Sequence, residues 1–275
     1  MKILYIHDYE NWAIHNVGKL WLDNNDIEVQ YINFNSIKSC NNFGTFDYVI
    51  FGFSTLWVKM QYMGENAIIV FHDPVEVFRE KNISQYKNKK IIVASSEVHE
   101  LLKQRNIFST IIPTTTLLEY RDELFCNEEA KIISINSGDK RKNNDQLRKF
   151  FKYYNFEFNL KIGLHIKSIE EYTKCLDDSN IYICMSVYEG GPLTAFDAMA
   201  RGCIVLSTKV GQLTELIVDE YNGFLLDKEE DFYEKLNWIK NNKDWLLNAR
   251  NNSIKTLKEK RNKESIKQKI KQYFL

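Results

Sequence analysis

The sequence predicts an α/β protein with two open, doubly wound parallel sheets. Short apolar runs of strand length alternate with helix-like segments along the chain. One stretch of mixed polarity, residues 114–130, interrupts the alternation and is the predicted linker. With 275 residues, of which 44% are hydrophobic and 27% charged, the chain is long enough for two small domains. Strands that alternate with helices favour parallel pairing, because each connection must cross a face of the sheet.

The first domain is predicted to span residues 1–118. Its expected strands occupy residues 2–7, 28–33, 47–51, 67–72, 90–94 and 110–113. Helices are expected at 16–24, where apolar residues share one side, and at 96–104. Ligands of such open sheets bind at the carboxyl ends of the strands, so any ligand of this domain is expected at that edge.

The second domain is predicted to span residues 130–250. Its expected strands occupy residues 131–136, 156–162, 181–185, 203–207 and 224–226. Helices are expected at 146–154, at 169–176 and from residue 211 onward, with two or three more at the end of the chain. The carboxyl ends of these strands are again the expected ligand edge.

Composition restricts the class of protein further. The formal net charge is zero, so no global field attracts nucleic acid. The five cysteines are scattered and odd in number, which favours reduced thiols in a cytoplasmic protein over a disulfide framework. Residues 1–7 are a predicted strand and not a signal peptide, and no stretch approaches the roughly 20 apolar residues of a membrane span.

The strongest chemical signal is the stretch 189–197, Glu-Gly-Gly-Pro-Leu-Thr-Ala-Phe-Asp, between two predicted strands. Gly190 and Gly191 are expected to let the backbone bend sharply and approach a ligand closely. Pro192 suits the first position of a helix, where its missing N–H costs nothing. The pattern therefore predicts a strand, a tight turn and a short helix.

Polar groups of this turn suit a ligand with an anionic middle and hydroxyl-rich ends. The N–H groups of Leu193 and Thr194 would point out of the positive helix end, toward a phosphate. Glu189 is placed to bond sugar hydroxyls, and Asp197 lies roughly 7 Å further along the helix. On spacing alone, a helix-end carboxylate for Glu189 and a solvated helix face for Asp197 are the favoured explanations. The strand–Gly-Gly-Pro–helix context favours a nucleotide-sugar site.

This stretch resembles the donor-binding signature of retaining GT-B glycosyltransferases of the group 1 (family 4) type. The matching positions are Ser186, Glu189, Ala198, Met199, Ala200 and Gly202. The second acid of the family signature, a Glu, is Asp197 here, and the downstream Gly-Gly-x-x-Glu is Gly211-Gln-Leu-Thr-Glu215. Residues 94–102, 111–113, 131–138 and 222–226 also resemble family segments. Unlike many family members, the chain has no Gly-Gly loop after its first strand, and its second domain is short.

The resemblance implies a GT-B fold, with two Rossmann-like domains facing a cleft. It implies a hexosyltransferase that moves a sugar from a nucleotide-diphosphate-sugar donor to a hydroxyl of a glycan or lipid-linked acceptor, with retention of configuration. The first domain would hold the acceptor and the second the donor. The alternatives are a non-catalytic nucleotide- or sugar-binding module of the same fold, or a nucleotide-using epimerase.

The resemblance also assigns two cations to the donor diphosphate. In the loop 138–143, Lys142 fits the family's Lys, and Arg141 or Lys140 stands in for its Arg, because Asp139 follows the glycine directly. The alternative is a solvated basic loop. No metal or other cofactor is expected, since these cations and the helix end can offset the charge of the leaving diphosphate.

His72 closes a predicted strand of the first domain, at the ligand edge. In the resembling enzymes a His at a similar strand end lies near the reacting sugar, so Glu189 and His72 are the expected catalytic residues. The alternative for His72 is a cap on a buried strand, and the pair His7-Asp8 is a weaker candidate of the same kind.

The last segment, residues 251–275, places apolar residues at helical spacing among lysines. It is expected to form a helix that crosses back to the first domain. The alternative is a basic amphipathic helix on an anionic membrane surface.

Overall fold

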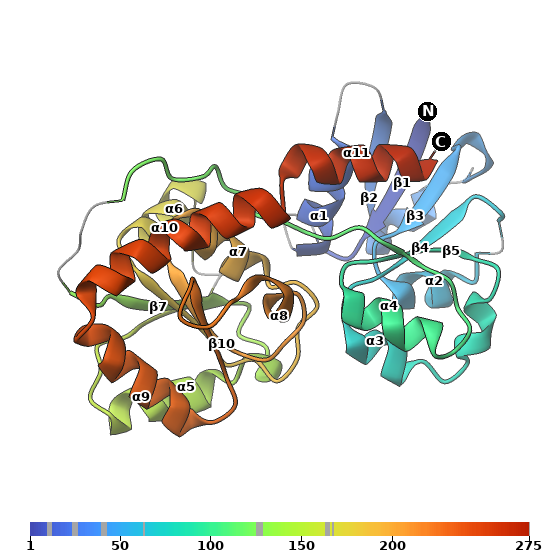
Figure 1. Ribbon diagram of the computed structural model, residues 1–275. Coiled ribbons are helices and arrows are strands. Elements are labelled where there is room, and N and C mark those ends of the chain that lie inside the picture. Colours follow the sequence, from blue (N-terminus) through green and yellow to red (C-terminus); the bar gives the residue numbers. More distant parts are fainter. Residues whose placement is uncertain are drawn as a thin grey trace. The chain divides into compact units, whose positions relative to one another are not determined.

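The computed structural model describes residues 1–9, 13–23, 27–39, 43–62, 64–124, 129–162, 166 and 168–274. The chain divides into two compact units (Figure 1). Unit 1 comprises Met1–Thr114 and Lys263–Leu275, and unit 2 comprises Thr115–Asn262. The predicted linker 114–130 therefore does not stand apart, because its described residues from 115 onward belong to unit 2.

Unit 1 contains a six-stranded parallel sheet with the order β2-β1-β3-β4-β5-β6. Its strands are β1 (Lys2–His7), β2 (Glu28–Asn33), β3 (Tyr48–Phe51), β4 (Ala67–Phe71), β5 (Lys90–Val93) and β6 (Thr110–Ile111). Its helices are α1 (Ala13–Leu22), α2 (Ser54–Met60), α3 (Pro74–Arg79), α4 (Ser96–Lys103) and α11 (Lys263–Phe274). All five residues of β4 are buried, as expected of a central parallel strand covered on both faces.

Unit 2 contains a five-stranded parallel sheet with the order β11-β10-β9-β7-β8. Its strands are β7 (Ile132–Asn136), β8 (Asn159–Ile162), β9 (Ile181–Cys184), β10 (Ile204–Thr208) and β11 (Gly223–Leu226). Its helices are α5 (Asn144–Tyr153), α6 (Ile169–Asp177), α7 (Leu193–Ala200), α8 (Leu213–Leu216), α9 (Glu229–Lys240) and α10 (Lys243–Lys260). The signature helix α7 lies between β9 and β10 and is buried over most of its length.

The C-terminal segment is two helices where the sequence suggested one. Helix α10 ends at Lys260 in unit 2, and α11 belongs to unit 1, where it packs against α1. Ile266, Ile270 and Phe274 are buried there. The apolar residues that a membrane-lying helix would insert are thus covered by unit 1, and the exposed side of α11 carries polar residues.

None of the helices that the structure describes combines the length and apolar character that a bilayer crossing requires. The three cysteines within the described residues, Cys175, Cys184 and Cys203, are free thiols. Cys40 and Cys126 lie outside the described residues.

Candidate functional site

The signature turn, residues 185–192, leaves β9 at the carboxyl edge of the unit 2 sheet and leads into α7. The helix begins at Leu193, one residue later than predicted, and Pro192 is its N-cap with extended backbone (φ −71°, ψ 93°). The N–H groups of Ala195 and Phe196 donate to the Pro192 carbonyl over 2.9 and 3.2 Å. The amides of Leu193 and Thr194 stand at the positive end of the helix, as predicted for an anion site.

The bend of this turn does not depend on glycine-specific backbone at Gly190 or Gly191, since neither has a positive φ. Gly211 does, with a φ of 47°, and it lies against the turn. A Cβ atom at this position would lie 2.3 Å from the Glu189 carbonyl oxygen and 2.4 Å from that of Gly190. The amide of Gln212 donates to the same Gly190 oxygen over 2.9 Å. The turn is thus shaped by a second loop packed directly on its backbone.

Lys142 and Glu189, predicted to bind the diphosphate and the sugar, are brought together. The Lys142 ammonium donates to Oε1 of Glu189. The side chains are only 12% and 4% exposed, so each charge is compensated chiefly by the other. The structure therefore places a buried ion pair beside the start of α7.

The loop that carries Lys142 is fixed at its base by two asparagines. The side-chain amides of Asn136, at the end of β7, and Asn144, at the start of α5, donate to each other over 2.7 and 2.9 Å. Asn136 Oδ1 also accepts the N–H of Gly138 over 2.9 Å. These bonds define where the loop 138–143 leaves the sheet.

The far end of this loop is bonded to the signature turn. Asn143, in left-handed backbone (φ 53°), donates from its side chain to the Met185 carbonyl over 2.9 Å. The Arg141 carbonyl accepts the N–H of Val187 over 2.8 Å. The Arg141 guanidinium lies 5.7 Å from the centre of the Tyr188 ring. Arg141 is thus part of the site, and its side chain rests on Tyr188.

A small cavity of about 10 Å³ lies beneath the ion pair, which is room for about one water molecule. Its lining includes Lys142, Glu189, Tyr182 and Thr194. The Tyr182 hydroxyl bonds the Ile135 carbonyl and the Thr194 hydroxyl, each over 2.7 Å. Thr194 is therefore held from below by the sheet, which fixes the first turn of α7.

A larger, open pocket of about 320 Å³ adjoins the turn. It runs past the carboxyl ends of β9, β10 and β11, and its lining includes Asn143, Val187, Lys209, Asp227 and Glu229. Lys209 and Asp227 form an exposed ion pair of 2.6 Å. Ligands of doubly wound sheets bind at this edge.

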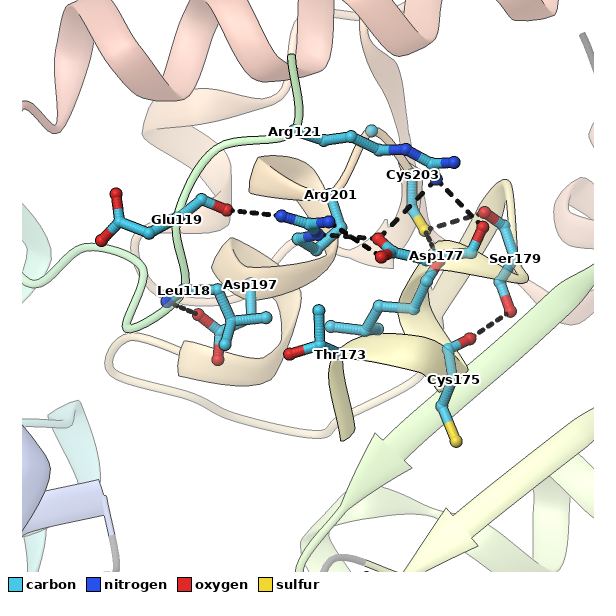
Figure 2. A network of polar contacts seen from close by, with 12 residues as sticks. Leu118, Glu119, Arg121, Thr173, Cys175, Asp177, Ser179, Asp197, Arg201 and Cys203 are labelled. Atoms are coloured by element: carbon cyan, nitrogen blue, oxygen red, sulfur yellow. Dashed lines mark hydrogen bonds and ion pairs between the residues drawn. The ribbon is translucent and has the colours of Figure 1, made fainter. Parts of the chain in front are cut away.

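Asp197, the second acid of the signature, is buried, with only 1% of its surface exposed. It is therefore not on a solvated helix face. Its carboxylate accepts hydrogen bonds from Thr116, Leu117, Leu118 and Tyr172, all of unit 2 (Figure 2 shows the contact with Leu118). Burial raises the pKa of Asp197, and these four donors oppose that rise. The acid faces the beginning of unit 2 and helix α6, and it offers no open surface to a ligand.

His72 directly follows β4 in unit 1. Its Nε2 lies 2.8 Å from the Gly52 carbonyl, which can only accept, so Nε2 carries the proton. The ring lies nearly parallel to those of Trp21 and Phe53, with centroids 6.3 and 6.4 Å away. Burial lowers the pKa of His72 to about 4. The imidazole is therefore neutral at physiological pH.

Glu76 is a residue that the sequence reasoning missed. Its Oε1 accepts the N–H of His72 over 2.6 Å and that of Asp73 over 3.2 Å. Its Oε2 accepts the N–H and the hydroxyl of Ser54 over 3.1 and 2.5 Å. Glu76 thus fixes the turns after β3 and β4, which set the position of His72. The spacing of Asp73 and Glu76 is that of a capping box, which would have been a readable signal.

The other predicted candidates have packing or structural contacts. His7 stacks on His15 at 4.2 Å and 7°, and both are buried in unit 1. Glu215, in the downstream motif, forms an ion pair with Arg261 at the end of α10.

Comparison with solved structures identifies the class of fold. Sucrose-phosphate synthase from Thermosynechococcus elongatus superposes with a TM-score of 0.79 at 13% identity, over 100% of this chain and 98% of that chain. Anabaena HepE in complex with UDP-glucose gives 0.73 at 11% identity, over 99% and 98%. TarM from S. aureus, in a complex that contains UDP, gives 0.66 at 19%, over 82% of this chain and 55% of that chain. The chain has the GT-B fold, with two Rossmann-like α/β units.

One protein family matches part of the sequence. Residues 137–260 match the family described as glycosyl transferases group 1. This region contains the loop of Lys142, the turn of Glu189 and helices α5 to α10. No protein of curated function matches the sequence significantly.

Proposed function

We propose that this protein is a glycosyltransferase that moves a sugar from a nucleotide-diphosphate-sugar donor to a hydroxyl acceptor. The observation that carries the proposal is the buried Lys142–Glu189 pair at the start of α7, inside the region that matches the glycosyltransferase family. The GT-B fold supports it, and the similar HepE structure holds UDP-glucose.

The donor diphosphate would lie at the start of α7. The amides of Leu193 and Thr194 would donate to its oxygens, and the helix end favours its charge. Lys142 would exchange Glu189 for the diphosphate, and Arg141 would supply a second positive charge. The side chains of Gly190 and Gly191 are single hydrogens, so the ligand can approach this backbone closely.

Release of Lys142 would free the Glu189 carboxylate for the hydroxyls of the donor sugar. The open pocket of about 320 Å³ beside the turn is a suitable place for the nucleoside. The ion pair would thus hold both side chains in position until the donor binds and replaces it.

We infer a retaining transfer by front-face attack. The bond between the anomeric carbon and the diphosphate oxygen breaks, and a bond from that carbon to the acceptor oxygen forms on the same face. The acceptor proton passes to the leaving phosphate oxygen. Lys142 and the helix end would stabilise the developing phosphate charge, so we expect no metal requirement. A hexosyl donor is our expectation, and Glu189 would act on it directly.

The acceptor side is assigned to unit 1. Neutral His72, with its Nε2 proton directed at Gly52, would present Nδ1 as an acceptor for a hydroxyl of the acceptor or the sugar. A glycan or lipid-linked acceptor, a cytoplasmic location and the absence of a nucleic-acid partner stay predictions from the sequence.

The test is a panel of UDP-, GDP-, ADP- and CMP-sugars, assayed for hydrolysis and for transfer to simple glycan acceptors. Glu189→Ala should abolish turnover while circular dichroism shows a folded protein. Glu189→Gln keeps an oxygen for Lys142 but loses the charge, and it should also be inactive. Glu170→Ala removes an exposed carboxylate of α6 and should be fully active. Wild-type turnover by Glu189→Ala would refute the site.

A non-catalytic nucleotide- or sugar-binding module of the same fold is the second candidate. One observation favours it: both acids of the signature, Glu189 and Asp197, are bonded within unit 2. Such a module would bind a nucleotide sugar from the panel without hydrolysing or transferring it. Free isomerised sugar nucleotide in the same assay would indicate an epimerase instead.

A further inference from the structure

Asp197 occupies the position of the signature at which the resemblance expects an acid on the donor ribose. We propose instead that Asp197 is a positioning residue, which fixes helix α7 to the leading segment of unit 2, residues 115–124. This inference rests on the proposed function, because the site that α7 positions is the donor site.

The carboxylate of Asp197 already binds hydrogen-bond donors of its own unit. Its Oδ1 accepts from the Thr116 hydroxyl over 2.6 Å and from the N–H groups of Leu117 and Leu118 over 2.7 and 3.3 Å. Its Oδ2 accepts from the Tyr172 hydroxyl over 2.8 Å. Three of these donors converge on Oδ1, which therefore has no acceptor site left, and the fourth bonds Oδ2.

The contact between Asp197 and the leading segment is buried. Thr116 is fully buried and Asp197 nearly so. Burial also raises the pKa of Tyr172 well above its usual value, so this hydroxyl keeps the proton that it donates to Asp197. Because only 1% of Asp197 is exposed, a ribose hydroxyl could reach the carboxylate only by displacing the groups that cover it. Loss of one of the present donors would leave a buried polar group without its partner.

The other end of α7 is bonded to the same segment. The Arg201 guanidinium donates to the Glu119 carbonyl over 2.9 Å and to both carboxylate oxygens of Asp177 over 2.7 and 2.8 Å. The N–H of Arg121 donates to the carbonyl of Ala200 over 3.0 Å. Figure 2 shows Arg201 reaching toward Glu119 on one side and Asp177 on the other.

The two attachments fix both the position and the rotation of α7 on the leading segment. Asp197 is one helical turn from Thr194, and the backbone donors of the proposed diphosphate site stand at the start of this eight-residue helix. A shift of about 1 Å in such donors can cost about 100-fold in activity. Asp197 therefore acts on the donor through the position of the helix.

The experiment compares the binding nucleoside diphosphate from the donor panel (UDP, GDP or ADP) with its 2′-deoxy and 3′-deoxy forms, by calorimetry. Asp197→Ala should weaken binding of all three forms by the same factor, about tenfold. The ratio of each deoxy Kd to the ribose Kd should therefore equal that of the wild type. Direct contact with the ribose predicts the opposite: the loss in Asp197→Ala would vanish for one deoxy form.

Conservative variants separate positioning from disruption. Asp197→Asn keeps Oδ1 for the leading segment and can donate to Tyr172, so it should restore most of the affinity. Thr116→Val and Tyr172→Phe each remove one donor, and each should reproduce the uniform loss more weakly. Thr173→Ala is the matched control, since its hydroxyl donates to the Ile169 carbonyl of its own helix over 2.8 Å. If Asp197→Ala fails to fold, Thr116→Val undergoes the same ratio test.

Hydrogen exchange provides a readout without any ligand. Asp197→Ala should raise exchange at the amides of Leu117 and Leu118 relative to Thr173→Ala, and Asp197→Asn, which keeps Oδ1, should raise it less. Thr116→Val should raise exchange at Leu118, whose N–H also donates to the Thr116 hydroxyl. Unchanged exchange at these amides would overturn the inference. If the wild type binds no nucleoside diphosphate, the proposed function fails, and the exchange result still decides whether Asp197 holds the segment.

Discussion

Gly211→Ala tests whether the downstream loop shapes the donor turn. The φ of Gly211 is 47°, a left-handed conformation that costs an alanine about 1–2 kcal/mol. The added Cβ would also lie 2.3 and 2.4 Å from the carbonyl oxygens of Glu189 and Gly190, both backbone atoms that have no rotamer to change. Such overpacking typically costs about 1–3 kcal/mol. The free energy of unfolding should therefore fall by about 2–5 kcal/mol.

The clash also has a functional consequence, because relief requires the turn to move away from Gly211. Glu189 would then be displaced relative to the start of α7, and donor affinity should fall about tenfold or more. Gly223→Ala is the control: its Cβ would lie 2.2 Å from the Val205 carbonyl oxygen, at the amino end of β11. Urea unfolding and donor titration of both variants measure the two effects.

Gly223→Ala should lose stability and keep its affinity for donor. Gly211→Ala should lose both. If Gly211→Ala binds donor as the wild type does, the packing of this loop does not determine the geometry of the turn, and the reasoning fails.

Two further predictions concern the loop of Lys142 and the histidine of unit 1. Asn136→Ala removes three hydrogen bonds at the base of the loop, each worth about 1 kcal/mol. The variant should therefore lose about 2–3 kcal/mol in the free energy of unfolding and have a higher KM for donor. A wild-type free energy of unfolding together with a wild-type KM would contradict this. His72 has a pKa of about 4 when folded and 6.5 as its ordinary value, so between these values the unfolded chain binds a proton that the folded protein does not. Stability should fall as the pH drops through this window, by up to about 3 kcal/mol. Burial raises the pKa of Glu76 to about 8, and this carboxyl opposes the loss in both proteins. Urea unfolding at pH 7 and pH 4 should therefore show a change that is less favourable in the wild type than in His72→Gln by this amount, and the same change in both would show that His72 is not responsible.

The sequence was sufficient for the fold because both sheets are parallel and buried. A strand covered on both faces is a continuous apolar run, as in β4 and β9, and such runs are visible without any partner. The signature turn was also visible, since its residues are consecutive. Its helix begins one residue later than predicted, because Pro192 has the extended backbone of an N-cap.

The partners of Asp197 could not be read from the sequence. Thr116 is 81 residues away, in a stretch whose mixed polarity suggested a linker. Nothing in the composition of residues 114–130 distinguishes a free connection from a segment packed on a helix. The resemblance assigns Asp197 to the ribose of the donor. In the structure its carboxylate instead accepts hydrogen bonds from Thr116, Leu117, Leu118 and Tyr172.

The break between α10 and α11 could not be predicted from the sequence, again because distant residues determine it. The residues around it, Lys260-Arg-Asn-Lys263, include no glycine or proline. The helix ends where distant groups bind Arg261: Glu215 pairs with its guanidinium, and the Thr115 hydroxyl donates to its carbonyl over 2.6 Å. Tertiary contacts therefore set this boundary, and local propensity does not reveal it.

We propose above all that the diphosphate of a nucleotide sugar binds Lys142 at the start of α7. The most direct measurement is the melting temperature of the wild type, Lys142→Met and Lys149→Met with the nucleotide-sugar panel. Lys149 is an exposed lysine of α5 and serves as the control. A donor at about 100 times its Kd stabilises the folded state by about 2.7 kcal/mol, which raises the melting temperature by several degrees. We predict this rise for the wild type and Lys149→Met with one donor, and its loss in Lys142→Met. An equal rise in Lys142→Met, or no rise in the wild type with any donor, would contradict the claim.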